Sequence, residues 1–101
     1  MSTSDIYYLE QAVDAFKDTL KVYKPDRQPI EWATAKYDVG DALVDLGERA
    51  AGVRYLEEAV DNYREALTVL SKDKSPDLWG KIQHSLKIAL DDLYQRGWKG
   101  G

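Results

Sequence analysis

Three aspartates, Asp38, Asp41 and Asp45, are separated by three and four residues, a spacing that places side chains on one face of an α-helix. Carboxylates gathered in this way could bind a basic peptide or a hard divalent cation. A cation needs several oxygens that converge from a bent loop or from facing helices, whereas these carboxylates spread over about 10 Å of one helix. We therefore expect no metal and no other cofactor. Two interpretations remain, an acidic binding face and an ordinary solvated helix face.

The only histidine, His84, and its neighbour Ser85 are the other residues whose types could support catalysis. Acid–base or nucleophilic chemistry would require an activated partner beside them in a dry pocket. The sequence contains no glycine-rich phosphate loop and no nucleophile elbow. We expect that the protein is not an enzyme and that His84 is a surface residue at the edge of a groove.

Composition restricts the class of protein further. The chain has 101 residues, which predicts a single domain over residues 1–101, and it has no cysteine. Its 18 acidic and 14 basic residues give a net charge of −4, and the basic residues are scattered, which argues against nucleic acid as a partner. No apolar run is long enough for a membrane span and no signal peptide is recognisable, so we expect a cytoplasmic protein without a membrane partner.

The strongest pattern is an internal repeat. When the sequence is shifted by 47 residues, residues 8–50 and 55–97 are identical at 16 of 43 positions without a gap. The matches include six of the seven positions from Tyr8 to Asp14 against Tyr55 to Asp61, and Trp32 against Trp79. A fixed period of this length is typical of stacked supersecondary units that cannot bury their apolar faces alone.

Each repeat contains two segments with apolar residues at helical spacing, which predicts an all-α fold of antiparallel helical hairpins. Pro29 and Pro76 fit the first turn of a helix, and Gly47 and Gly97 fit the left-handed position that follows a helix. We expect four helices near residues 4–24, 29–46, 53–71 and 76–96.

Residues 40–67, GDALVDLGERAAGVRYLEEAVDNYREAL, resemble the tetratricopeptide repeat in its long-period bacterial form. Val39-Gly40 stands at the Leu-Gly position of that family's first helix, and Ala59, Tyr63 and Ala66 fit the spacing of its second helix. The 47-residue period differs from the usual one of about 34 residues, and Lys87 replaces the expected glycine in the last helix. The resemblance implies a short solenoid that opens on a second-type helix, holds one complete repeat and closes on a first-type helix.

The resemblance also implies a concave groove, lined by first-type helices, that binds a peptide or a partner helix. With the acidic stripe, it predicts a non-catalytic protein–protein interaction module for a basic partner. The expected groove residues are Thr34, Tyr37, Asp38, Asp41, Asp45, Lys81, His84, Ser85 and Ile88.

The two end helices lack their usual neighbours, so apolar side chains there should promote association. The expected self-association residues are Ile6, Tyr7, Leu90 and Trp98. We favour a two-fold homodimer; the alternatives are a head-to-tail contact that extends the solenoid and a compact four-helix arrangement that covers its own ends. Self-assembly is thus the second functional hypothesis, and a fragment or engineered excerpt of a longer array is another interpretation of the chain.

Overall fold

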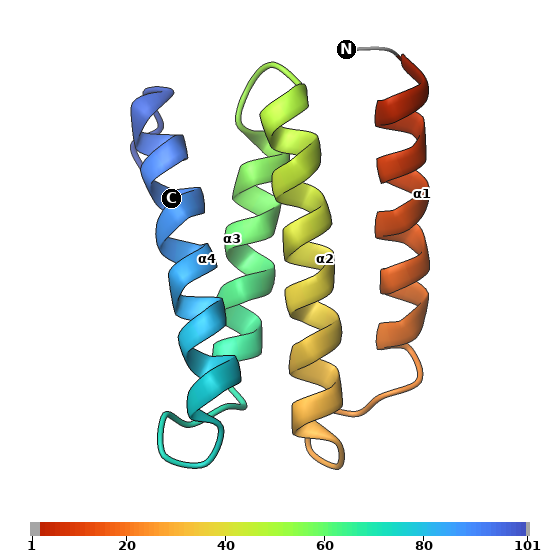
Figure 1. The fold of residues 1–101 in the computed structure, drawn as a ribbon, viewed down its shortest axis with the longest axis vertical. Helices are drawn as coiled ribbons and strands as arrows, with labels where there is room; N and C mark the ends of the chain where they lie inside the picture. The colour runs from red at the N-terminus through yellow and green to blue at the C-terminus, as the bar shows by residue number, and fades with distance from the viewer. Residues whose placement is uncertain (1–2, 101) are drawn as a thin grey trace.

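The computed structural model describes residues 3–100, which form four α-helices and no strand (Figure 1). The helices are α1 (Thr3–Leu20), α2 (Pro29–Arg49), α3 (Arg54–Leu67) and α4 (Pro76–Gln95). The predicted all-α class is confirmed, and each predicted helix is present. Pro29 and Pro76 occupy the first turns of α2 and α4, where a missing N–H removes no helical hydrogen bond. None of these helices is both long enough and apolar enough to cross a membrane.

Two helices end earlier than the sequence pattern predicts. At the end of α1 the amides of Lys21 and Val22 donate to carbonyls three residues back, at 3.1 Å each, instead of four. Pro25 disfavours helical backbone at the residue before it, so the helix cannot continue to residue 24. The end of α3 tightens in the same way, with Thr68 donating to the Glu65 carbonyl at 3.1 Å.

The two glycines expected to follow helices have different roles. Gly97 has a φ of +90° and follows α4 in a Schellman arrangement. Its amide donates to the Tyr94 carbonyl and the Trp98 amide donates to the Leu93 carbonyl, both at 3.0 Å. The prediction for Gly47 was wrong, because α2 continues through it to Arg49.

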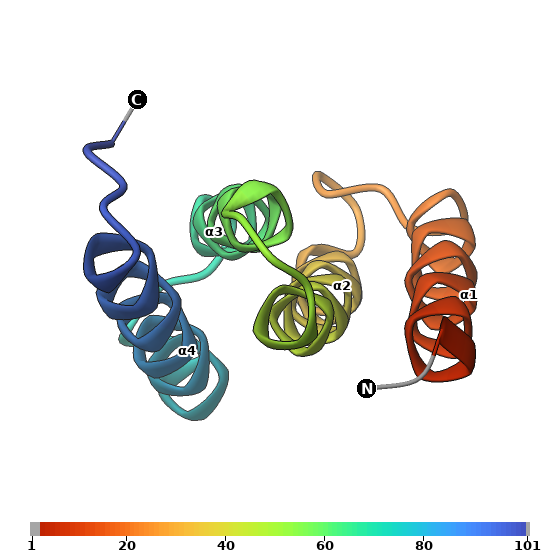
Figure 2. The same ribbon diagram turned by 90° about the horizontal axis from the view of Figure 1, so that it is seen from above.

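The helices lie in a row in which each contacts the next along the chain (Figures 1 and 2). The helix α2 also contacts α4, whereas α1 and α4 make no contact with each other within residues 3–100. Viewed from above, the row zigzags and leaves α1 and α4 at opposite ends (Figure 2). A bundle that closes on itself by bringing the end helices together is therefore not what this chain forms.

The core runs along the middle of the row, between α2 and its neighbours. Its most completely buried large side chains come from α2, α3 and α4: Val39, Leu43, Leu46, Leu56, Val60, Tyr63, Ile82 and Leu93. The helix α1 contributes less, with Val13 as its one buried apolar residue in the described chain. The row is therefore packed most tightly around α2 and α3.

Two glycines of α2 allow this tight packing. A Cβ atom at Gly40 would lie 2.5 Å from Cε1 of Tyr63, and one at Gly47 would lie 2.8 Å from Cγ of Leu56. Real Cβ atoms do not approach other heavy atoms so closely, so α3 can reach this position only because both residues lack side chains. The spacing of seven residues places the two glycines on the same face of α2.

Candidate binding surface between α2 and α4

A hollow of about 330 Å³ lies between α2 and α4, with a residue of α3 at its base. It brings together four of the predicted groove residues, Asp41 and Asp45 from α2 with Ser85 and Ile88 from α4. The full lining is Asp41, Val44, Asp45, Glu48, Tyr63, Ser85 and Ile88. Carboxylates therefore stand beside apolar side chains, and Ile88 is 48% exposed.

Tyr63 connects the base of this hollow to its acidic side. Its ring is 1% exposed, and its hydroxyl donates a hydrogen bond of 2.6 Å to Oδ1 of Asp41. Burial, and next the bond to this carboxylate, raises the pKa of the Tyr63 hydroxyl, so it stays a donor at neutral pH. Burial also raises the pKa of Asp41; the Tyr63 bond opposes that shift and the nearby charge of Asp45 adds to it. The carboxylate of Asp41 is thus held in place at some electrostatic cost.

The rest of the predicted α2 face borders a different hollow. Thr34 and Asp38 line a space of about 260 Å³ near the end of α1, together with Thr19, Tyr23 and Ile30 among others. Burial raises the pKa of Asp38, and the charge of Asp41 raises it further. The predicted acidic stripe is therefore continuous along α2 but faces two separate concave spaces.

Three predicted groove residues do not line either space. Tyr37 is half-buried and packs on Tyr63, with ring centroids 6.0 Å apart. Lys81 and His84 are exposed on α4. Tyr37 thus packs against the side of Tyr63, whereas Lys81 and His84 line neither of the two hollows.

The expected self-association residues lie at both ends of the row. On α1, Ile6 is half-buried against the core and Tyr7 is 61% exposed. On α4, Leu90 is half-buried. Trp98 packs against Tyr94 with centroids 5.4 Å apart and donates from Nε1 to Glu57 at 2.9 Å. The four residues form no single patch, because α1 and α4 do not touch.

The sequence pattern identified Tyr63 only by its spacing from Ala59 and Ala66, and this spacing gave no indication of its polar role. A usable signal was present, because a tyrosine buried in a core needs a partner for its hydroxyl. Within residues 3–100 no group of three or more histidine, cysteine, aspartate or glutamate side chains could hold a metal ion. The arrangement places fixed carboxylates beside apolar side chains, and such a surface can bind a ligand that carries both positive charge and apolar groups.

Comparison of the chain with protein-family models, with curated proteins and with solved structures gave no match. The tetratricopeptide resemblance therefore stays a prediction that rests on the pattern residues themselves.

The raised pKa of Asp38 gives a prediction about stability. An acid whose pKa is raised by folding destabilises the folded state when it is charged. This destabilisation is complete at pH values above the folded pKa, and it is absent below the unfolded pKa near 3.8. We expect Asp38→Asn to increase the unfolding free energy by roughly 0.5 kcal/mol at pH 7, an effect limited by solvent screening. Urea denaturation should show this gain vanishing as the pH falls towards 3.

A matched control is Asp61→Asn, which makes the same change at an exposed position inside α3. It should leave the unfolding free energy nearly unchanged at both pH values. Equal effects of the two substitutions would show that the burial of Asp38 and its proximity to Asp41 carry no stability cost.

Proposed function

We propose that the protein is a non-catalytic interaction module that binds a basic peptide or helix in the hollow between α2 and α4. The observation that carries this proposal is the lining of that hollow, where Asp41, Asp45 and Glu48 stand beside Val44 and Ile88. A segment with alternating basic and apolar residues would find a carboxylate for its charges and a partly exposed apolar floor for its other side chains.

Electrostatics favour a cationic partner over an anionic one. Burial and the neighbouring aspartate already make the charge on Asp41 unfavourable, and a positive group placed in the hollow would relieve that repulsion. An acidic peptide would add to it. The chain as a whole has a net charge of −4, which acts in the same direction over longer distances.

The packing of the helices supports a tetratricopeptide-type solenoid as the framework for this site. Each helix contacts the next, the end helices stay apart, and the additional contact joins α2 to α4, the two helices expected to line the groove. Gly40 receives Tyr63, so the two family-pattern residues meet in the fold. A row of helices whose ends stay apart leaves surface between neighbouring helices on which a partner could bind.

The test is fluorescence anisotropy with two labelled peptides of equal length and identical leucine positions, one carrying lysines and the other glutamates. We expect only the basic peptide to bind. The triple variant Asp41→Asn, Asp45→Asn, Glu48→Gln should weaken binding at least tenfold, about 1.4 kcal/mol, at low salt. Asparagine can still accept the Tyr63 hydrogen bond, so the variant is expected to fold.

A control variant removes the same charge elsewhere on the protein. It combines Glu10→Gln, Asp14→Asn and Asp61→Asn and leaves Lys17 unchanged. Glu10 and Asp14 line a different hollow, which is bordered by Glu58 on α3. This variant should retain the affinity. Equal losses in the two variants would indicate non-specific attraction, and a preference for the acidic peptide would refute the proposal.

A further inference from the structure

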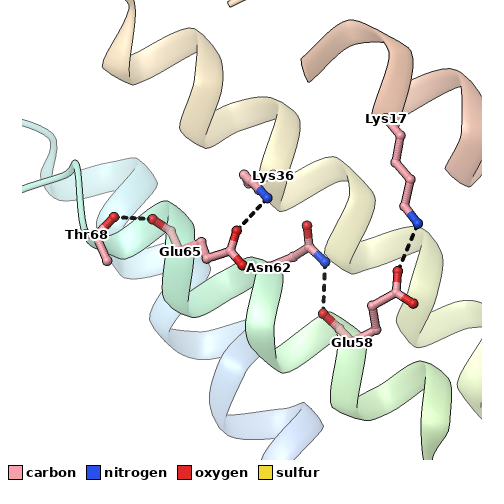
Figure 3. A network of polar contacts seen from close by, with 6 residues as sticks. All are labelled: Lys17, Lys36, Glu58, Asn62, Glu65 and Thr68. Atoms are coloured by element: carbon pink, nitrogen blue, oxygen red, sulfur yellow. Dashed lines mark hydrogen bonds and ion pairs between the residues drawn. The ribbon is translucent and has the colours of Figure 1, made fainter. Parts of the chain in front are cut away.

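A strip of α1 is exposed along most of its length, with Ala12 half-buried. Its residues, which we call the α1 outer face, are Tyr8, Ala12, Ala15, Phe16 and Thr19. Tyr8 is 73% exposed and Phe16 is 36% exposed. On the opposite side of the helix, Lys17 pairs with Glu58 of α3 at 3.0 Å (Figure 3), so α1 is fixed in the row with this strip uncovered.

The internal repeat shows what covers the same strip in the other copy. A shift of 47 residues maps the α1 outer face onto Tyr55, Ala59, Asn62, Tyr63 and Ala66 of α3. There Ala59 and Ala66 are 0% exposed and Tyr63 is 1% exposed. They are buried where α3 packs on its neighbouring helices, and Tyr63 itself meets Gly40 of α2. The corresponding strip of α1 is mostly exposed.

Three contacts define what the covering helix must provide. Gly40 gives room to the Tyr63 ring and Gly47 gives room to Leu56. Lys36, four residues before Gly40, pairs with Glu65 at the edge of α3 (Figure 3). The α1 counterparts are Phe16 for Tyr63, Leu9 for Leu56 and Asp18 for Glu65.

We propose that the α1 outer face docks one helix of another protein, patterned like α2. That helix carries small residues at two positions seven apart and a basic residue four positions before the first. The first small residue receives Phe16, the second receives Leu9, and the basic residue meets Asp18. Phe16 has no hydroxyl, so no counterpart of Asp41 is required. This surface is independent of the hollow between α2 and α4.

Two hollows lined by residues of α1 and α2 border the ends of the α1 outer face. One hollow of about 360 Å³ lies at the Leu9 end, lined by Asp5, Tyr8, Leu9 and Arg49. The hollow of about 260 Å³ described above lies at the Thr19 end. In the α3 copy, the positions of Leu9 and Phe16 are held by Leu56 and Tyr63, which contact α2.

Head-to-tail stacking with a second copy of this chain does not supply the required helix. Head-to-tail stacking would present α4 to the α1 outer face, in the place of α2. The residues of α4 that correspond to Gly40 and Gly47 are Lys87 and Tyr94, whose side chains would occupy the space that Phe16 and Leu9 need. Tyr94 is also packed against Trp98. The helix α4 is therefore a poor match for the α1 outer face.

The test uses a synthetic peptide of residues 29–49, the sequence of α2 itself, titrated into the intact protein and followed by amide NMR shifts. We expect the shifted amides to cluster on α1. A second peptide with Gly40→Lys and Gly47→Tyr, the residues found in α4, should bind at least tenfold more weakly. Its helix propensity is higher, so weaker binding would report lost fit and not lost helicity.

Two protein variants locate the site. Ala15→Arg changes an exposed position of α1 and is expected to melt close to the wild type. Phe16→Glu alters a ring that is 36% exposed and is expected to remain folded with a lower melting temperature. Each should weaken peptide binding at least tenfold. If the peptide shifted amides on α3, and did so equally in the wild type and in both variants, the peptide would be replacing α2, and the proposal would be overturned. So would the absence of shifts at about 1 mM peptide. A dimeric mass in light scattering that Ala15→Arg abolishes would assign the face to a second copy and overturn it as well.

Discussion

Replacing Gly40 by leucine is expected to lower the unfolding free energy by about 3 kcal/mol or to prevent folding altogether. The Cβ atom alone would lie 2.5 Å from Cε1 and 2.9 Å from Cδ1 and Cζ of the Tyr63 ring. That ring is 1% exposed, and its hydroxyl is bonded to Asp41, so it has little room to move. The helices α2 and α3 would have to separate. Urea denaturation followed by circular dichroism measures the loss.

Gly80 offers the matched control for this substitution. It lies inside α4, and a Cβ atom there would meet nothing within 4 Å. Gly80→Leu should therefore stabilise the fold by up to about 0.8 kcal/mol, because leucine favours helix over glycine by roughly that amount. Effects of opposite sign are expected from the same substitution at two helical glycines. If both variants lost stability equally, close approach of α3 to Gly40 would not be what requires glycine there.

The fold was largely predictable because its signals are local and repeated. Helical spacing of apolar residues and the prolines at the starts of two helices located all four segments. The last turns of α1 and α3 were less predictable, since apolar residues such as Val22 and Val69 continue the pattern beyond the helix. There the backbone tightens to bonds three residues back, which no side-chain period reveals.

Gly47 shows why glycine is ambiguous in a sequence. A glycine near the end of an apolar stripe can serve a left-handed turn or a close helix contact, and both need the absence of a Cβ atom. At Gly97 the first use is observed, and at Gly47 the second. Only the position of Leu56, which belongs to the next helix, distinguishes them.

The candidate site was predicted in part. Helical spacing predicted Asp41 and Asp45 on one face, and the tetratricopeptide resemblance implied Ser85 and Ile88 across a groove from them; the four residues line one hollow. It could not show that Thr34 and Asp38 face another hollow, because this depends on where α1 ends and how its loop returns to α2. The bond from Tyr63 to Asp41 joins residues of different helices and is likewise invisible to any local pattern.

The equivalent aromatic side chains of the two repeats, Tyr63 and Phe16, should contribute very differently to the unfolding free energy. We expect Tyr63→Ala to lower the unfolding free energy by about 4 kcal/mol. The substitution leaves a cavity at a fully buried site between α2, α3 and α4, and it removes the hydroxyl that donates to Oδ1 of Asp41. Tyr63→Phe, which keeps the ring and removes only the hydroxyl, should cost about 1 kcal/mol. Urea denaturation of both variants separates the packing contribution from the hydrogen bond.

Phe16→Ala makes the equivalent change in the first repeat and should cost only about 1 kcal/mol, since this ring is 36% exposed and has no helix over it. The difference between the two repeats measures what a covering helix contributes. A cost for Phe16→Ala close to that for Tyr63→Ala, especially one that grows with protein concentration, would mean that another copy already covers α1 in solution. The expected small cost agrees with an α1 outer face that is free to bind the helix of another protein. In the presence of the peptide of residues 29–49, Phe16→Ala should then lower the unfolding free energy by more than it does in the absence of the peptide.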